Sequence, residues 1–203
     1  FSTACYAFDS GASRVIATNT AEKALLLKEQ YHNPVLAGER DEKKIEGFDL
    51  GNSPTEIIKI DLNGKTLILT TTAGTKGLLN AARAEMIITG SLVNAGAVAR
   101  YIRSLNPSYV SLVAMGYRAV NSADEDLLCA EIIRSDLEEK RIDYEERIKM
   151  LRESSGKRFF DPANIDFSPP TDFFLCTMLN RFDFVIRGEK RADGNIDLMR
   201  IDY

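Results

Sequence analysis

Short apolar runs that alternate with longer segments of helical pattern constrain the fold of this chain more than any other feature. Seven runs have the length and apolar content of strands: Arg14–Ala17, Val35–Ala37, Thr66–Thr70, Met86–Thr89, Tyr109–Ala114, Phe184–Arg187 and Ile196–Ile201. Six segments between them have helical periodicity: Thr20–Tyr31, Pro54–Ile58, Thr75–Ala84, Val93–Leu105, Asp124–Lys140 and Tyr144–Glu153. Apolar strands separated by helices are typical of a mainly parallel sheet covered on both faces. We therefore expect an α/β fold, a three-layer α/β/α sandwich with a mainly parallel (mixed) sheet.

The C-terminal part of the chain has a different pattern. Asp193-Gly194 lies between the last two expected strands and is a hairpin signal, so we expect the C-terminal edge of the sheet to be antiparallel. Residues Asp161–Pro170 carry three of the six prolines of the chain, which indicates a loop or crossover.

Composition limits the class of protein. The 203 residues, 44% apolar and 28% charged, are expected to form a single α/β domain over residues 1–203 or two closely packed lobes. No run approaches the roughly 18 uninterrupted apolar residues of a membrane span, and the net charge of −4 gives no basic field for nucleic acid. The wide spacing of Cys5, Cys129 and Cys176 does not indicate a disulfide framework. The first residues also lack the charged and apolar pattern of a secretion signal. We expect a cytoplasmic protein, with a homodimer as an open alternative to a monomer.

Any metal site in this chain is expected to use oxygen ligands. His32 is the single histidine, and the cysteines lack the Cys-x2-Cys spacing of zinc sites. Carboxylate, amide and hydroxyl oxygens suit a hard cation, and Mg²⁺ fits that ligand set best.

The run from Gly47 to Pro54 places an acid, two glycines, an amide and a hydroxyl directly before a helix. Ser53 is suited to the N-cap position and Pro54 to the first helical position. Glu56 is suited to complete a capping box, in which its side chain reaches back to the main chain at the N-cap. The N–H groups and partial positive charge of a helix N-terminus suit an anion such as phosphate. A well-capped surface helix without a ligand is the alternative.

Polar residues also follow three of the expected strands. Glu39 and Arg40 follow the second strand, Thr70–Thr75 the third, and Ser91 and Asn94 the fourth. Ligands of open parallel sheets bind outside the carboxyl ends of the strands, so we expect these residues to line one crevice.

Each of these residues has a chemical role and a structural alternative. Arg40 is suited to clamping a phosphate or sulfonate, or to a surface ion pair with Glu39 or Asp41. Asn52 and Asn94 are suited to orienting substrate oxygens or to capping helices.

The threonine-rich loop is an anion-binding candidate without a known nucleotide motif. Gly74 would let the backbone approach an anion closely, but the GxxxxGK[ST] spacing of a Walker loop is missing. A threonine-capped helix is the alternative.

Two phosphatase chemistries are not supported. Cys129 and Cys176 each have an arginine five positions on, a Cys-x4-Arg spacing instead of the Cys-x5-Arg of cysteine phosphatases. Asp124-Glu125-Asp126 begins a helix, whereas aspartyl-phosphate enzymes of the haloacid dehalogenase type carry the nucleophile at a strand end.

Several runs resemble one family in the same order along the chain. They are Leu36–Arg40, Gly47–Pro54, Thr70–Thr75, Gly90–Ala95 and Glu125–Ala130. Together they resemble the 2-phosphosulfolactate phosphatases, the magnesium-dependent phosphatase family of coenzyme M biosynthesis (ComB-like). The resemblance covers roughly Phe1 to Leu137 and weakens beyond.

The resemblance implies a magnesium-dependent phosphatase that converts (2R)-2-phospho-3-sulfolactate to 3-sulfolactate and phosphate. It implies these roles: catalytic Asp49, Glu39 and Arg40; substrate-binding Asn52, Ser53, Thr72, Gly74, Thr75 and Asn94; metal-binding Asp49, Glu125 and Asp126. An aspartyl-phosphate intermediate on Asp49 stays open. Family members also resemble one another in an Asp-x-x-Arg-Ala stretch before the counterpart of Phe1-Ser2-Thr3, so a strand, a carboxylate and an arginine are expected upstream of residue 1.

Two other function classes stay open at this point. A non-catalytic anion- or metabolite-binding domain could retain the fold without the chemistry. The hypothesis of a nucleotide-binding oxidoreductase is supported only by the α/β pattern, because no GxGxxG motif lies at the start of a helix.

Overall fold

The computed structural model of the chain describes residues 1–81, 83–140 and 142–203. The helices are α1 Ser2–Asp9, α2 Ala21–Lys28, α3 Pro54–Ile57, α4 Gly74–Asn80, α5 Ala95–Leu105, α6 Asp124–Leu137, α7 Glu145–Met150 and α8 Pro170–Thr177. The strands are β1 Arg14–Thr18, β2 Val35–Arg40, β3 Lys43–Lys44, β4 Thr66–Thr70, β5 Ile87–Thr89, β6 Val185–Lys190 and β7 Ile196–Ile201. Short 3₁₀ turns lie at Leu92–Asn94, Leu151–Glu153, Lys157–Phe160 and Pro162–Asn164.

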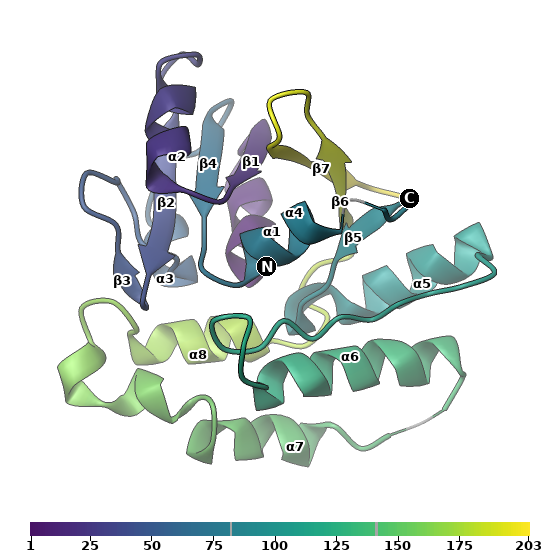
Figure 1. Cartoon of the computed structure of the whole chain (residues 1–203). Helices are drawn as coiled ribbons and strands as arrows, with labels where there is room; N and C mark the ends of the chain where they lie inside the picture. The colour runs from purple at the N-terminus through teal and green to yellow at the C-terminus, as the bar shows by residue number, and fades with distance from the viewer. Residues whose placement is uncertain (82, 141) are drawn as a thin grey trace.

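The described strands form one mixed sheet with the order β3-β2-β4-β1-β7-β6-β5 (Figure 1). Only β2–β4 and β4–β1 pair in parallel, and the other four described pairs are antiparallel. The expectation of a mainly parallel sheet is therefore wrong. The expected hairpin is confirmed, since β6 and β7 pair antiparallel around Gly194 at φ +81°. This hairpin lies inside the sheet, between β1 and β5, so its expected place at an edge is wrong. Because β5 pairs antiparallel with β6, β5 runs opposite to β1.

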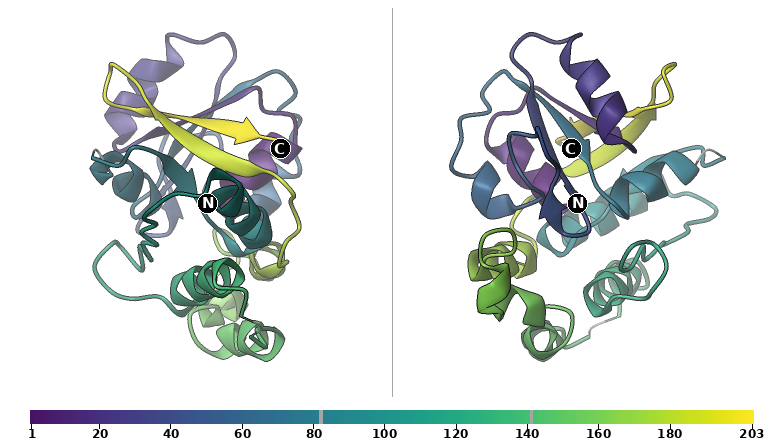
Figure 2. Two further views of the ribbon diagram at one scale, coloured as in Figure 1. Left: turned by 90° about the vertical axis from the view of Figure 1, so that its right-hand side faces the viewer. Right: turned by 60° about the vertical axis from the view of Figure 1, so that its left-hand side comes forward.

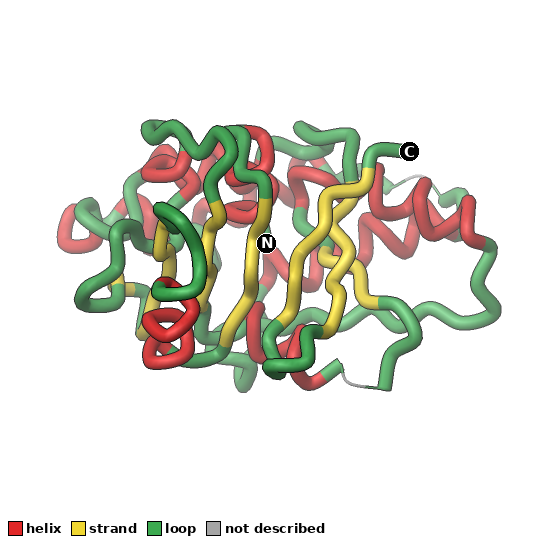
Figure 3. The backbone as a smooth tube through the Cα atoms, turned by 90° about the horizontal axis from the view of Figure 1, so that it is seen from above, coloured by secondary structure: helices red, strands yellow, loops and turns green. Residues whose placement is uncertain are grey.

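Apolar side chains alternate between the two faces of the parallel strands. Val15 and Leu67 pack in a core with α1 and α3, whereas Ile16 and Ile68 pack in a second core with α2. Figure 3 shows helical segments on both sides of the strands. Helices therefore cover both faces around β1, β2 and β4, as the period-2 burial of a strand requires.

A third core holds the remaining helices together. Side chains of α5 and α6 pack with those of α8 and with Val185 of β6. Both views of Figure 2 show α6, α7 and α8 gathered at one end of the molecule. None of the helices in the described part of the chain combines the length and the apolar content needed to cross a bilayer.

The sequence pattern located most elements but not all. Helices α1 and α8 were not expected: six consecutive residues of α1 are buried, which hides its periodicity, and the prolines before α8 suggested a loop. The expected strand Tyr109–Ala114 is wrong, because these residues form no strand, and Tyr109 is 83% and Val113 71% exposed. The expected helix Thr75–Ala84 ends earlier, as α4, and its residue 82 lies outside the described residues.

The N-terminus of α3 confirms Ser53 as the N-cap. Its Oγ accepts a hydrogen bond from the N–H of Glu56 at 3.3 Å. The carboxylate of Glu56 reaches back as expected, but it accepts from the N–H of Gly51 at 2.5 Å.

A buried carboxylate of α8 binds to the same helix end. Asp172 is 3% exposed, and its Oδ1 accepts from the Ser53 hydroxyl and from the Thr55 N–H, both at 2.8 Å. The Thr171 and Thr55 hydroxyls add a contact of 2.7 Å. The anion at this helix N-terminus is therefore a side chain of the protein, which ties α8 to α3.

We expect Asp172→Ala to lower the free energy of unfolding by about 1–3 kcal/mol, because it leaves two buried donors without an acceptor. The exposed Asp166→Ala should change it by less than about 0.5 kcal/mol. Thermal melting of both variants measures the difference. Equal melting curves would show that the Asp172 contacts contribute little to stability.

Candidate active site

The carboxyl ends of β1, β2 and β4 lie at one edge of the sheet, because these strands are parallel. The chain leaves β1 toward α2 on one face and leaves β4 toward α4 on the other, where Leu78 joins the α1 core. Neighbouring strands whose connections leave on opposite faces mark the usual ligand position of an open α/β sheet. This edge is therefore the candidate site.

The strand end that precedes Ser91 and Asn94, that of β5, does not lie at this edge. β5 runs antiparallel to β1, since each pair from β1 through β7 and β6 to β5 is antiparallel. Asn94 follows β5 and is fully buried, and its Oδ1 accepts from the N–H and hydroxyl of Ser91 at 3.0 and 2.9 Å. These contacts match the capping alternative for Asn94, and the direction of β5 separates it from the residues that follow β2 and β4.

Glu39 and Thr72 join the ends of β2 and β4. The Glu39 Oε1 accepts from the Thr72 N–H at 2.6 Å, and its Oε2 accepts from the Thr72 hydroxyl at 2.9 Å. A third bond, from the N–H of Glu42, is 3.1 Å long. The half-buried carboxylate thus holds the threonine loop in one position and keeps lone pairs for a further donor.

The threonine loop is also fixed from within. The Thr75 hydroxyl donates to the carbonyl of Thr71 at 2.6 Å, and the Thr75 N–H donates to the Thr71 hydroxyl at 3.2 Å. Thr75 is fully buried, so its hydroxyl serves the loop. Gly74 opens α4, and a Cβ there would lie 3.3 Å from the ring of Phe1. Close packing against Phe1, the N-cap residue of α1, is therefore one reason for a glycine at this position.

Arg40 lies beside Glu39 with an exposed side chain. Its guanidinium donates to the main-chain carbonyl of Asn19, after β1, at 3.3 Å. The ion-pair alternative with Asp41 is not formed, because Asp41 pairs with Arg118 at 2.6 Å. Arg40 thus links the ends of β1 and β2 and retains donors toward solvent.

Asp49 lies farther from this edge. Its Oδ2 accepts from the N–H of Leu36 at 2.8 Å, and the adjoining residues run beside β2. Leu36 precedes Glu39 by three residues, which is about 10 Å along a strand. Asn52, at the end of this segment, is exposed, and its carbonyl accepts from the Thr3 hydroxyl at 3.3 Å.

The acids at the start of α6 differ in their contacts. The Asp126 Oδ2 accepts from the N–H of Gly116 at 2.6 Å. The Glu125 Oε2 is buried and has no hydrogen-bond partner among the described residues. Across residues 1–81, 83–140 and 142–203, no three His, Cys, Asp or Glu side chains gather as a metal site would require. Asp49, Glu125 and Asp126 therefore do not form one preassembled cluster.

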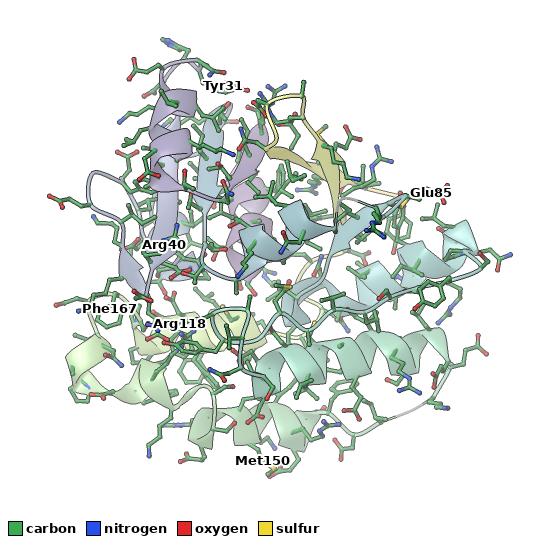
Figure 4. All side chains as sticks on the ribbon, viewed as in Figure 1. Tyr31, Arg40, Glu85, Arg118, Met150 and Phe167 are labelled. Atoms are coloured by element: carbon green, nitrogen blue, oxygen red, sulfur yellow. The ribbon has the colours of Figure 1, made fainter. Side chains whose placement is uncertain are left out.

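Tertiary structure brings further charged residues to this edge that sequence reasoning missed. The loop 115–122 reaches from α6 to the β2–β3 turn, where Arg118 meets Asp41 (Figure 4). Met115 of the same loop lies against Gly77 of α4. No local motif marks Arg118, because its contact is 77 residues away in sequence.

The cysteines lack the properties of a nucleophile. Burial raises the pKa of the Cys129 thiol to about 12 and the pKa values of Cys5 and Cys176 to about 11. A reactive thiolate needs a lowered pKa, so the thiols remain protonated near neutral pH.

We expect Cys129→Ala to lower the free energy of unfolding by about 1 kcal/mol and to keep turnover within about threefold. A thiol that stays neutral and buried contributes packing alone. Melting curves and turnover, measured together, test this. A loss of about 10³-fold with an intact fold would instead indicate a thiol nucleophile.

Asp49→Asn tests the predicted role of Asp49 against its observed contact. Since the asparagine oxygen can still accept from the Leu36 N–H, we expect turnover within about threefold and a stability loss below about 1 kcal/mol. The matched change Glu39→Gln, on the same strand, should lower turnover by at least about 10²-fold. A similar loss in Asp49→Asn with unchanged melting would support its role as a ligand or nucleophile.

Comparisons with known proteins agree with the resemblance in the sequence. The family model of 2-phosphosulpholactate phosphatase matches residues 1–190, which extends the similarity well beyond Leu137. A probable 2-phosphosulfolactate phosphatase of Bacillus subtilis is 32% identical over 200 residues, 97% of this chain and 85% of that protein. One of Carboxydothermus hydrogenoformans is 35% identical over 191 residues, 90% of this chain and 79% of that protein.

A shorter match has higher identity. A probable 2-phosphosulfolactate phosphatase of Caldanaerobacter subterraneus subsp. tengcongensis is 43% identical over 125 residues, 61% of this chain. That match spans about half, 52%, of the relative's own length. Taken with the family match over residues 1–190, these similarities show that the chain belongs to the 2-phosphosulfolactate phosphatase family, a family of phosphoric monoester hydrolases.

Proposed function

We propose that this protein is a magnesium-dependent phosphatase that hydrolyses (2R)-2-phospho-3-sulfolactate to 3-sulfolactate and phosphate. The observation that carries the proposal is the joining of the β2 and β4 ends by Glu39 and Thr72, in a chain of this family. It places an acid beside the exposed Arg40 at the edge where α/β proteins bind ligands.

In the proposed reaction, water forms a bond to phosphorus and the bond from phosphorus to the 2-oxygen of the acid breaks. Glu39 is suited to accept the proton of the attacking water, and Arg40 to bind the non-bridging phosphoryl oxygens with its planar fork. Thr72 holds the Glu39 carboxylate in its orientation. The leaving oxygen takes up a proton from solvent.

Magnesium is the proposed cofactor, and the buried Glu125 oxygen without a partner fits a cation ligand. Glu125 and Asp126 would supply the oxygen ligands, and Asp49→Asn tests whether Asp49 takes part as well. Mg²⁺ sites commonly use one or two carboxylates and complete the shell with waters and substrate phosphate. When bound, the cation would neutralise phosphoryl charge.

The remaining substrate contacts are proposed for Asn52, Thr72 and Gly74, whereas contacts of Ser53, Thr75 and Asn94 with the substrate stay predictions from the sequence. Of these, Asn52 is exposed, whereas Ser53, Thr75 and Asn94 are buried and already bonded within the chain. Sandwich layering over the whole sheet, a cytoplasmic location and a homodimeric state also stay predictions.

A non-catalytic anion-binding domain is the second candidate. The observation in its favour is that no preassembled cluster of three acids lies within the described residues. Binding of 3-sulfolactate without any phosphate release would identify this alternative.

We expect the protein to release phosphate from 2-phospho-3-sulfolactate in the presence of Mg²⁺, because the available donors are hard oxygen ligands. Excess chelator should abolish release, and added Mg²⁺ should restore it. A phosphate assay on one sample through both steps measures this. Full activity in excess chelator would contradict the metal-dependent mechanism.

A further inference from the structure

Two tight turns meet at the edge of the candidate site. The β2–β3 turn contains Asp41 and Glu42 at φ +53° and +70°, and the turn in loop 115–122 contains Arg118 and Ala119, both at φ +56°. Residues other than glycine rarely occupy this left-handed region, and two in succession need support from the surroundings. Two successive positive φ values are the usual geometry of a tight two-residue hairpin such as β2–β3, and they fix the position of the turn.

The turn that carries Arg118 is held by specific bonds. In loop 115–122, the Tyr117 N–H donates to the Asn121 carbonyl at 2.8 Å. Gly116 precedes it at φ +68°, and a Cβ there would lie 2.0 Å from the same carbonyl oxygen. The N–H of Gly116 donates to Asp126, as described above. Arg118 is therefore presented at a defined position.

The ion pair between Arg118 and Asp41 is more exposed than the ion pair between Arg158 and Glu42 on the same turn. Its side chains are 51% and 62% exposed, whereas those of Arg158 and Glu42 are 37% and 26% exposed. The Arg158 Nε is buried as well, so the Arg158 pair anchors the turn. An exposed ion pair is weakly held, because water solvates both partners. The Asp41 carboxylate can therefore yield Arg118 to another anion.

We propose that Arg118 is a specificity-determining residue that binds the substrate anion most remote from the phosphate, the sulfonate, and that Asp41 occupies Arg118 until substrate binds. This proposal rests on the proposed function and adds a residue to it. Arg40 directly precedes Asp41, so two guanidinium groups flank one turn at the rim of the site (Figure 4). A planar guanidinium fork suits the oxygens of sulfonate as well as phosphate.

The proposal predicts opposite effects for the two partners. Arg118→Gln should raise KM for 2-phospho-3-sulfolactate at least about tenfold and keep kcat within about threefold. The reason is that a contact with the sulfonate stabilises the bound substrate and the transition state equally. Asp41→Asn should leave that KM unchanged or lower it, because it removes the competing carboxylate. The matched substrate 2-phospholactate lacks only the sulfonate, and Arg118→Gln should change its KM by less than about twofold.

A structural ion pair would give a different pattern. Both substitutions would then shift KM in the same direction and equally for the two substrates, and this result would overturn the proposal. Arg134→Gln removes an exposed arginine that pairs with Glu138 on α6, and it should leave both KM values unchanged. Melting curves of all variants confirm that the fold is intact.

Failure of this proposal can be told apart from failure of the proposed function. If the parent protein releases no phosphate, calorimetric titration with 3-sulfolactate still tests the site. Binding at least about tenfold weaker in Arg118→Gln than in the parent would support the role of Arg118, and equal binding would overturn it.

Discussion

The pairing of β4 between β1 and β2 is the constraint on which the rest of the structure depends. Every residue of β4 is buried, because strands flank it on both sides and helices cover both faces. Its three central residues, Leu67, Ile68 and Leu69, are apolar, as burial on both faces requires, and a buried threonine lies at each end of the strand. Parallel pairing then brings the carboxyl ends of three strands to one edge, and the polar loops that follow them must meet there.

Carboxylates organise the loops at this edge and near it. Glu39 binds the threonine loop, Asp126 binds loop 115–122, and Asp172 binds the N-terminus of α3. Each accepts from main-chain N–H groups that are buried or partly buried and that would otherwise lack an acceptor. The family's polar motifs thus serve local structure first, and the groups still available to a ligand include the exposed Arg40 and Arg118 and the buried oxygen of Glu125.

This division explains why motif residues differ in accessibility. A helix N-terminus suits a phosphate and a side-chain carboxylate equally well, since both present oxygen anions to N–H groups. In α3 the carboxylate of Asp172 is already there. The arginines at the rim are exposed instead, so they can exchange their partners at low cost in desolvation.

The sequence by itself determined the strands and helices that have a clear hydrophobic period, the hairpin at Asp193-Gly194 and the membership of the family. These features depend on short runs of residues that are close together in the chain. Only tertiary structure decided that the hairpin enters the sheet beside β1 and reverses β5, which removes Asn94 from the edge that holds Glu39. It also decided that Asp172 binds Thr55, 117 residues away, and that Arg118 meets Asp41. Such contacts depend on how packed elements align, and no local pattern of polar and apolar residues encodes that alignment.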